Sequence, residues 1–161
     1  MADIVEIERA LAIVQKFDPL QRVLLTCTGT LQGTLSAWFG GPMKIVVIEQ
    51  GQQGTLVVGE TPLVDVMVFQ RVIEMKHKGK CVMRADSTIT TTRAEIENLI
   101  MERNLGLGQI MEKLGIRPEF NLLEADQDGD DFWRVYELLG HEVTYRIKEV
   151  FPQRLYRLRH G

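Results

Sequence analysis

Residues 143–151 read VTYRIKEVF, and this alternating stretch decides the fold because it predicts a β-strand with one buried face. Successive side chains of a strand point to opposite faces, so one face collects four apolar residues: Val143, Tyr145, Ile147 and Phe151. Glu149 falls on that same face. A lone buried charge costs several kcal/mol even after relaxation, so Glu149 needs either a partner or a ligand.

A second strand pattern repeats this anomaly with the opposite charge. Residues 65–75 read DVMVFQRVIEM, and Arg71 shares a face with Met67, Phe69, Ile73 and Met75. One cation and one anion on apolar strand faces suggest a closed pocket for a small polar ligand. The alternatives are an internal ion pair within the sheet and a solvated face that only looks apolar.

The chain has 161 residues, which fits a single domain over 1–161, and its 45% hydrophobic and 25% charged residues are ordinary for a globular protein. A net charge of −3 argues against a general attraction to nucleic acid. No apolar run approaches the roughly 18 residues that span a bilayer, and the acidic N-terminus does not read as a secretory signal. With only Cys27 and Cys81, neither a disulfide framework nor a zinc site is expected, and we predict a cytoplasmic protein with reduced thiols.

Periodicity and turn residues predict two groups of helices that alternate with two groups of strands. Helices are expected over residues 3–17, in two short pieces within 20–39, over 92–103 and over 107–114. Strands are expected over residues 44–50, 55–60, 64–76, 81–89, 116–124, 132–139 and 142–151, with 51–54 as a hairpin turn between the first two. This order indicates an α+β fold with an antiparallel β-sheet.

Two loop segments have features of metal-binding or phosphate-binding motifs. The acidic segment 126–131, followed by Glu137, comes close to a calcium loop, but Asp131 stands where the sharp turn needs glycine. Its flanks read as strands, so a solvated acidic loop is the favoured interpretation and calcium binding is a minor alternative. Gly106 and Gly108 do not complete a phosphate-binding motif, and Gly108 is expected to allow close backbone approach at a helix start. Neither a metal nor a cofactor is expected.

Arg71 and Glu149 have the chemistry of ligand-binding groups. A guanidinium is suited to bidentate capture of a carboxylate. A carboxylate in an apolar pocket can hydrogen-bond a hydroxyl or exchange a proton with it. The ligand interpretation is therefore favoured over the ion pair, which stays open.

Four short segments carry a resemblance to a known family: Leu24-Leu25 through Gly29-Thr30-Leu31, Phe69-Gln70-Arg71-Val72-Ile73, Leu107-Gly108 with Ile110 following, and Lys148-Glu149-Val150-Phe151-Pro152. In their order, their spacing and their coincidence with the two charged residues, they resemble the chorismate lyase (chorismate pyruvate-lyase) family over residues 24–156. The resemblance implies an antiparallel sheet with helices covering an enclosed ligand pocket.

The reaction implied by this resemblance is the cleavage of chorismate to 4-hydroxybenzoate and pyruvate without cofactor or metal. At the matching positions, Arg71 would bind the ring carboxylate, and Glu149 would face the hydroxyl end of the ring as an orienting group or as a general acid–base. Leu107, with the backbone beside Gly108, would line the pocket, and Leu31 would lie in the helical segment that covers it.

One departure from the family pattern concerns the pocket floor. Where the bacterial enzyme carries a Gly-Arg pair on the strand after the Arg71 strand, this chain has Ala85-Asp86. We therefore expect Ala85 to contribute to a pocket floor that differs from that of the bacterial enzyme, and the ring substituents of the substrate could differ with it.

A second hypothesis comes from a different class of protein. The same fold resembles the effector-binding domains of some bacterial transcription regulators, which bind small molecules without reacting them. Those domains usually follow an N-terminal winged-helix domain, for which 161 residues leave no room, so an enzyme or a free-standing sensor is favoured. In either case the expected partner is a small molecule, chorismate or its aromatic product, and not nucleic acid or a membrane.

Overall fold

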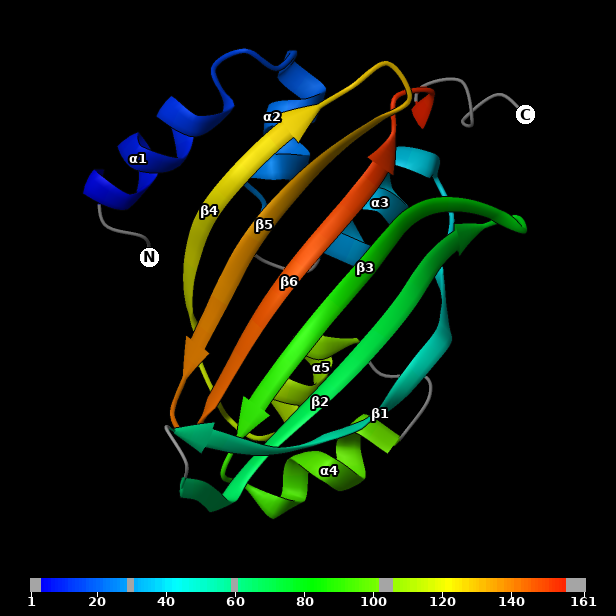
Figure 1. Cartoon of the computed structure of the whole chain (residues 1–161). Helices are drawn as coiled ribbons and strands as arrows, with labels where there is room; N and C mark the ends of the chain where they lie inside the picture. Colours follow the sequence, from blue (N-terminus) through cyan, green and yellow to red (C-terminus); the bar gives the residue numbers. More distant parts are fainter. Residues whose placement is uncertain (1–3, 29–30, 59–60, 102–105, 156–161) are drawn as a thin grey trace.

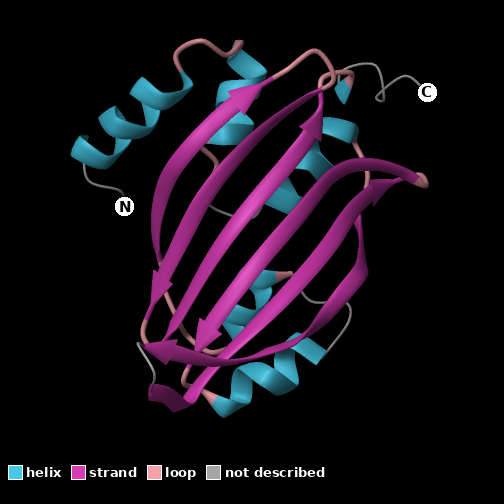
Figure 2. Cartoon of the chain, viewed as in Figure 1, coloured by secondary structure: helices cyan, strands magenta, loops and turns pink. Residues whose placement is uncertain are grey.

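One six-stranded antiparallel sheet organises the fold (Figures 1 and 2), as seen in a computed structural model that describes residues 4–28, 31–58, 61–101 and 106–155. The strands are β1 (Lys44–Val58), β2 (Thr61–His77), β3 (Lys80–Thr91), β4 (Glu119–Gln127), β5 (Asp131–Gly140) and β6 (Val143–Pro152). Their order in the sheet is β1-β2-β3-β6-β5-β4. Two units of three consecutive strands therefore meet where β3 pairs with β6, and the strand that carries Glu149 is central.

Helices cover one face of this sheet. The described helices are α1 (Ile4–Val14), α2 (Pro19–Leu25), α3 (Leu31–Phe39), α4 (Ala94–Met101) and α5 (Leu107–Lys113). In the figures, α2, α3 and α5 lie behind the sheet, whereas its front face carries none of these helices (Figures 1 and 2). The α+β architecture with an antiparallel sheet is confirmed. None of these five helices has the length and apolar character needed to cross a bilayer.

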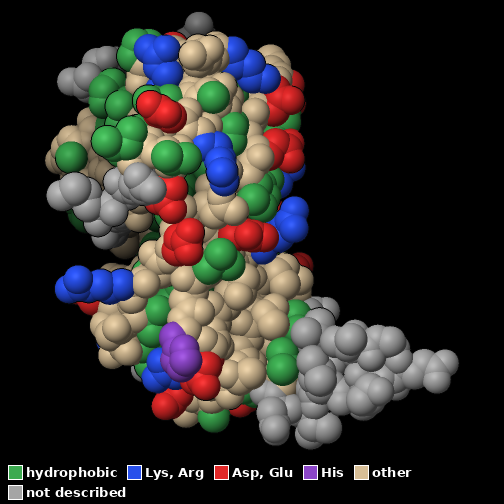
Figure 3. Space-filling model, turned by 90° about the vertical axis from the view of Figure 1, so that its left-hand side faces the viewer, with side chains coloured by type: hydrophobic (Ala, Val, Ile, Leu, Met, Phe, Trp, Pro, Cys, Tyr) green, Lys and Arg blue, Asp and Glu red, His purple; other side chains and the backbone are tan. Residues whose placement is uncertain are grey.

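Helix α1 lies beside the edge strand β4 and leaves most of its apolar stripe in solvent (Figures 1 and 3). Val14 is fully buried, whereas Ile4, Ile7 and Leu11 are 71%, 46% and 47% exposed. The helix ends three residues before the expected position 17, and residue 3 lies outside the described part of the chain. A capping box between Asp18 and Gln21 then starts α2 at Pro19.

The prediction of a hairpin turn at residues 51–54 is wrong. Strand β1 continues through this segment and stays paired with β2, with Gly51 opposite Gln70 and Gly54 opposite Val68. The register shifts between Gln52 and Gly54, as in a β-bulge. Glycine accommodates a bulge as readily as a turn, so the residues that predicted a turn produce an irregular strand instead.

The second half of the chain departs from the sequence prediction only at the element ends. Helix α4 starts at Ala94 rather than at residue 92, and residues 102–103, which the sequence assigned to its end, lie outside the described part. Gly115 follows α5 with φ +66°, the left-handed conformation expected after a helix. Strand β4 starts three residues later than expected because residues 116–118 form a connection without regular structure.

Replacing Gly140 with alanine should lower the free energy of unfolding by about 1–3 kcal/mol, because the added methyl group overpacks the end of β5. A Cβ at Gly140 would lie 2.7 Å from Ile116 Cγ2 and 3.2 Å from Val143 Cγ1, both on branched side chains that cannot swing away. Urea denaturation would measure the loss. Gly51→Ala is the matched control, since a Cβ there meets nothing within 4 Å. Equal stability of the two variants would contradict this packing account.

Candidate functional site

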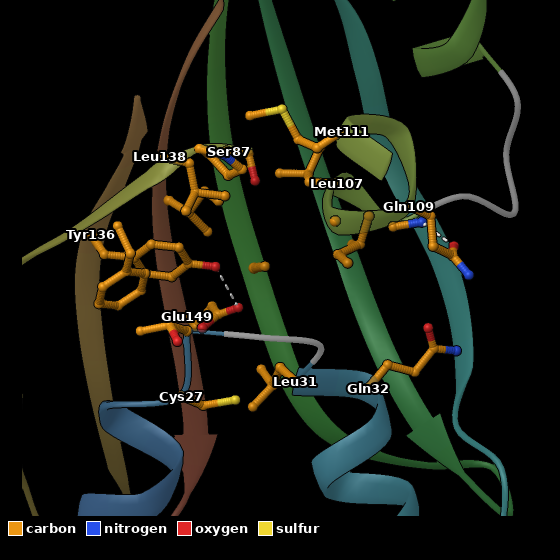
Figure 4. Close-up of a pocket in the computed structure, with 18 of the residues that line it drawn as sticks. Cys27, Leu31, Gln32, Ser87, Leu107, Gln109, Met111, Tyr136, Leu138 and Glu149 are labelled. Atoms are coloured by element: carbon orange, nitrogen blue, oxygen red, sulfur yellow. Dashed lines mark hydrogen bonds between the residues drawn. The ribbon is translucent and has the colours of Figure 1, made fainter. Parts of the chain in front are cut away.

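A pocket of about 650 Å³ lies on the helix-covered side of the sheet (Figure 4). This volume is within the range of about 300–1,000 Å³ that small-molecule sites occupy. All six residues to which the sequence assigned a binding role line this one pocket: Leu31, Arg71, Ala85, Leu107, Gly108 and Glu149. The fold thus brings together residues from α3, α5 and three different strands.

Short side chains at the centre of the floor create the space. In the sheet register, Arg71 of β2 lies opposite Ser87 of β3, and Ala85 of β3 lies opposite Glu149 of β6. Arg71 and Glu149 are thus two strands and two residues apart, which is roughly 12 Å between Cα atoms at ordinary strand spacing. Ala85 and Ser87 are both buried but fill little of the gap between the two charged residues.

The Ala85-Asp86 pair divides between the two faces of the sheet. Ala85 is 4% exposed and lines the pocket. Asp86 is exposed on the opposite face, across from Val72 and Lys148 on the neighbouring strands. Only Ala85 therefore shapes the floor at the position where the family resemblance implies a Gly-Arg pair.

Glu149 is held by two donors from the neighbouring strand β5. Arg134 Nε donates to Glu149 Oε1 at 2.6 Å. The Tyr136 hydroxyl donates to Glu149 Oε2 at 3.0 Å (Figure 4). Arg134 Nη1 also donates to the backbone oxygens of Leu25 at 3.1 Å and Cys27 at 2.8 Å. Glu149 therefore forms an internal ion pair with Arg134, whereas the alternative that the sequence left open was an ion pair between Glu149 and Arg71.

The sequence interpretation missed Arg134, although a signal for it was available. In residues 132–139, alternation puts Arg134 on one face with Phe132, Tyr136 and Leu138, and all four are buried. The cation therefore occupies an apolar strand face in the same way as Arg71. A charged residue on the apolar face of an alternating strand is the same signal that indicated Arg71 and Glu149. Because residues 132–139 and 142–151 were expected to form a hairpin, this signal predicts a second buried cation beside Glu149.

The ion pair shifts the protonation equilibria of its neighbours. Burial is the largest effect on the pKa of Arg134 and lowers it, but the combined effects of Glu149, Tyr136 and Cys27 outweigh burial, and the pKa is raised. Burial raises the pKa of Tyr136 well above its ordinary value, and the negative charge of Glu149 adds to the effect. Near neutral pH, Arg134 is thus a cation and Tyr136 a neutral hydrogen-bond donor.

Arg71 is 1% exposed and lies across from Glu149 in the pocket lining. Burial lowers the pKa of its guanidinium, and the nearby Tyr145 acts in the opposite direction. An arginine starts from so high a value that it keeps its charge near neutral pH. Burial likewise raises the pKa of Tyr145 to about 12, against the effect of Arg71, so this phenol stays neutral.

Leu31 from α3 and Leu107 from α5 approach the pocket from different sides (Figure 4). Leu31 is 7% exposed and belongs to the buried core. The expected close backbone approach at Gly108 is not found, because a Cβ there would meet nothing within 4 Å. Gly108 still lines the pocket, so its backbone borders open space rather than another protein segment.

The acidic segment 126–131 includes the end of β4, the connection at residues 128–130 and the first residue of β5. Asp128 Oδ1 accepts the backbone N–H groups of Asp130 and Asp131, both at 2.8 Å. Within the described part of the chain, no three His, Cys, Asp or Glu side chains are grouped so that they could hold a metal ion. The flanks of the loop are the strands β4 and β5, as the solvated-loop interpretation expects.

Comparison with known proteins does not assign a family to the chain or a function to this pocket. A scan of the chain against protein-family models gave no match, and a search of curated proteins found no significantly similar chain.

Proposed function

We propose that this protein is a lyase that cleaves chorismate to 4-hydroxybenzoate and pyruvate without a cofactor. The observation that carries the proposal is the placement of Arg71 and Glu149 on two strands of one pocket, with the small residues Ala85 and Ser87 between them. It is supported by the resemblance to the chorismate lyase family, which assigns binding roles to Arg71 and Glu149.

The two charged residues would hold opposite ends of the aromatic ring. In 4-hydroxybenzoate the carboxylate and the hydroxyl lie para to each other, so recognition requires a cation and an acceptor at opposite ends of a pocket. Arg71 would bind the carboxylate through its guanidinium, and Glu149 would accept a hydrogen bond from the hydroxyl. The floor between them would lie under the ring.

The chemistry needs little more than this placement. The ether bond between ring and enolpyruvyl oxygen breaks while the hydrogen on the adjacent ring carbon leaves, and the ring becomes aromatic. Transfer of that hydrogen to the enolpyruvyl methylene carbon gives the methyl group of pyruvate, so no water is consumed. An enzyme can promote such a step by holding the ether in a reactive geometry in a site from which water is excluded. Leu31 and Leu107 would provide the apolar cover of an enclosed pocket.

Incubation of the purified protein with chorismate tests the proposal. We expect 4-hydroxybenzoate and pyruvate in equal amounts, measured by chromatography and by an enzymatic assay for pyruvate, at a rate well above that of chorismate alone. Absence of products, combined with tight binding of 4-hydroxybenzoate, would instead favour a small-molecule sensor of the same fold. Absence of both products and binding would contradict any role for the pocket in recognising such an acid.

A further inference from the structure

We propose that Arg134 and Tyr136 are positioning residues that fix Glu149 as an anionic acceptor, so that the pocket selects aromatic acids whose far end is an uncharged hydroxyl. The inference rests on the proposed function for the orientation of the ligand. It assigns roles to two residues of β5 that the family resemblance does not name. It also specifies what Glu149 does: it accepts a hydrogen bond and does not donate one.

The first support is the division of donors between the two oxygens of Glu149. Arg134 Nε occupies one site on Oε1 and the Tyr136 hydroxyl occupies one site on Oε2. An ionised carboxylate offers about four acceptor sites, so each oxygen keeps capacity for a further donor. A ligand hydroxyl can supply that donor, whereas a phenolate or another carboxylate would bring a second negative charge against Glu149.

The second support is the rigidity of Arg134 itself. Its Nη1 is tied to the backbone oxygens of Leu25 and Cys27, where α2 ends and the connection to α3 begins. Its guanidinium carbon lies 4.4 Å from the centre of the Tyr136 ring and 5.5 Å from that of Phe120. With 1% exposure the side chain has no room to swing. Glu149 is therefore aimed by a group that is already fixed before a ligand arrives.

The third support is burial of the whole group. Glu149 is 5% exposed and Tyr136 is 7% exposed, and both line the pocket with Arg134. A hydrogen bond to a charged acceptor in such a site is worth roughly 1.5–3 kcal/mol, or roughly ten- to a hundredfold in affinity. A ligand that lacks the hydroxyl would forgo this bond, and the site would discriminate against it.

Binding of 4-hydroxybenzoate and of benzoate, measured by calorimetry, tests the inference without relying on turnover. We expect the wild-type protein to prefer 4-hydroxybenzoate roughly tenfold or more. Tyr136→Phe should reduce this preference severalfold while it leaves benzoate affinity nearly unchanged, because Arg71 is intact. Arg134→Gln should reduce the preference further, and Arg134→Lys should restore part of it by keeping one charged donor.

Tyr145→Phe is the matched control for removing a phenolic hydroxyl. The Tyr145 hydroxyl is buried and has no hydrogen-bond partner among the described residues, and Tyr145 is absent from the lining of this pocket. The ratio of 4-hydroxybenzoate affinity to benzoate affinity in Tyr145→Phe should equal that of the wild-type protein. If Arg134→Gln does not fold, Tyr136→Phe, which keeps the ion pair, decides the outcome.

A wild-type preference close to one, or a preference unchanged in Tyr136→Phe, would overturn the inference. These outcomes are distinct from failure of the proposed function. A hydroxyl preference that falls in Tyr136→Phe, without chorismate cleavage, would reject the lyase and retain the positioning roles. Cleavage with a preference insensitive to these variants would retain the lyase and reject the positioning roles.

Discussion

Replacing Arg134 with methionine should lower the free energy of unfolding by about 3–5 kcal/mol, because it leaves the Glu149 charge buried without its ionic partner. Glu149 is only 5% exposed, so solvent cannot replace the lost interaction. The backbone oxygens of Leu25 and Cys27 lose their bonds from Arg134 as well, which adds to the cost. Guanidinium chloride denaturation, followed by circular dichroism, would measure the change.

Two further variants make this prediction specific to the ion pair. Arg84→Met removes a cation from the exposed face of β3 and should change stability by no more than about 0.5 kcal/mol. The double variant Arg134→Met/Glu149→Leu removes both charges and should recover most of the loss, since apolar residues of similar size often replace a buried pair at little cost. A loss below about 1 kcal/mol in Arg134→Met would show that Glu149 does not depend on this partner.

Arg71→Ala and Glu149→Ala should each reduce chorismate turnover at least tenfold, which corresponds to about 1.4 kcal/mol of activation free energy. Arg71→Ala removes the proposed anchor of the ring carboxylate, and Glu149→Ala removes the acceptor for the hydroxyl. Steady-state rates with chorismate would measure both effects. Glu149→Gln belongs in the same series, because it keeps the shape of the side chain if the alanine variant folds poorly.

Arg146→Ala is the control for loss of a cation from the sheet, because Arg146 is exposed on the opposite face of β6. Its turnover should match that of the wild type. Wild-type rates in both Arg71→Ala and Glu149→Ala would exclude this pocket as the reaction site.

The sheet was predictable because its central strands follow simple patterns. Strict alternation around Glu149 and Arg71 gave the correct buried faces, and both side chains are almost fully buried as that pattern requires. The end of α5 was predictable for the same kind of local reason, since Gly115 adopts the positive φ that favours glycine. Local chemistry and periodicity are enough in such cases.

The errors arose where local residues are compatible with two structures. Gly51 and Gly54 fit a turn and a bulged strand equally well, and only the long pairing of β1 with β2 decides between them. Helical spacing predicted α1 but not what it packs against, and at the edge of the sheet Val14 is buried while Ile4, Ile7 and Leu11 stay exposed. Such outcomes depend on tertiary contacts that periodicity does not contain.

The candidate site was likewise predictable only in part from the sequence. Arg71 and Glu149 could be chosen as anomalies on apolar faces, but their separation depends on the strand order, which places β3 between β2 and β6. The anomalies at Arg71 and Glu149 do not by themselves indicate Arg134 as the ionic partner of Glu149. The pairing of β5 with β6 places Arg134 directly opposite Glu149 and so supplies the partner.

The structure of the protein with bound 4-hydroxybenzoate would test most directly the central claim that Arg71 and Glu149 hold the two ends of one aromatic acid. The predicted result is a ring above Ala85 and Ser87, with the carboxylate within about 3.2 Å of the Arg71 guanidinium and the hydroxyl within about 3.2 Å of a Glu149 oxygen. A ligand outside this pocket, or one whose carboxylate contacts Arg134 while Arg71 contacts no part of it, would contradict the claim.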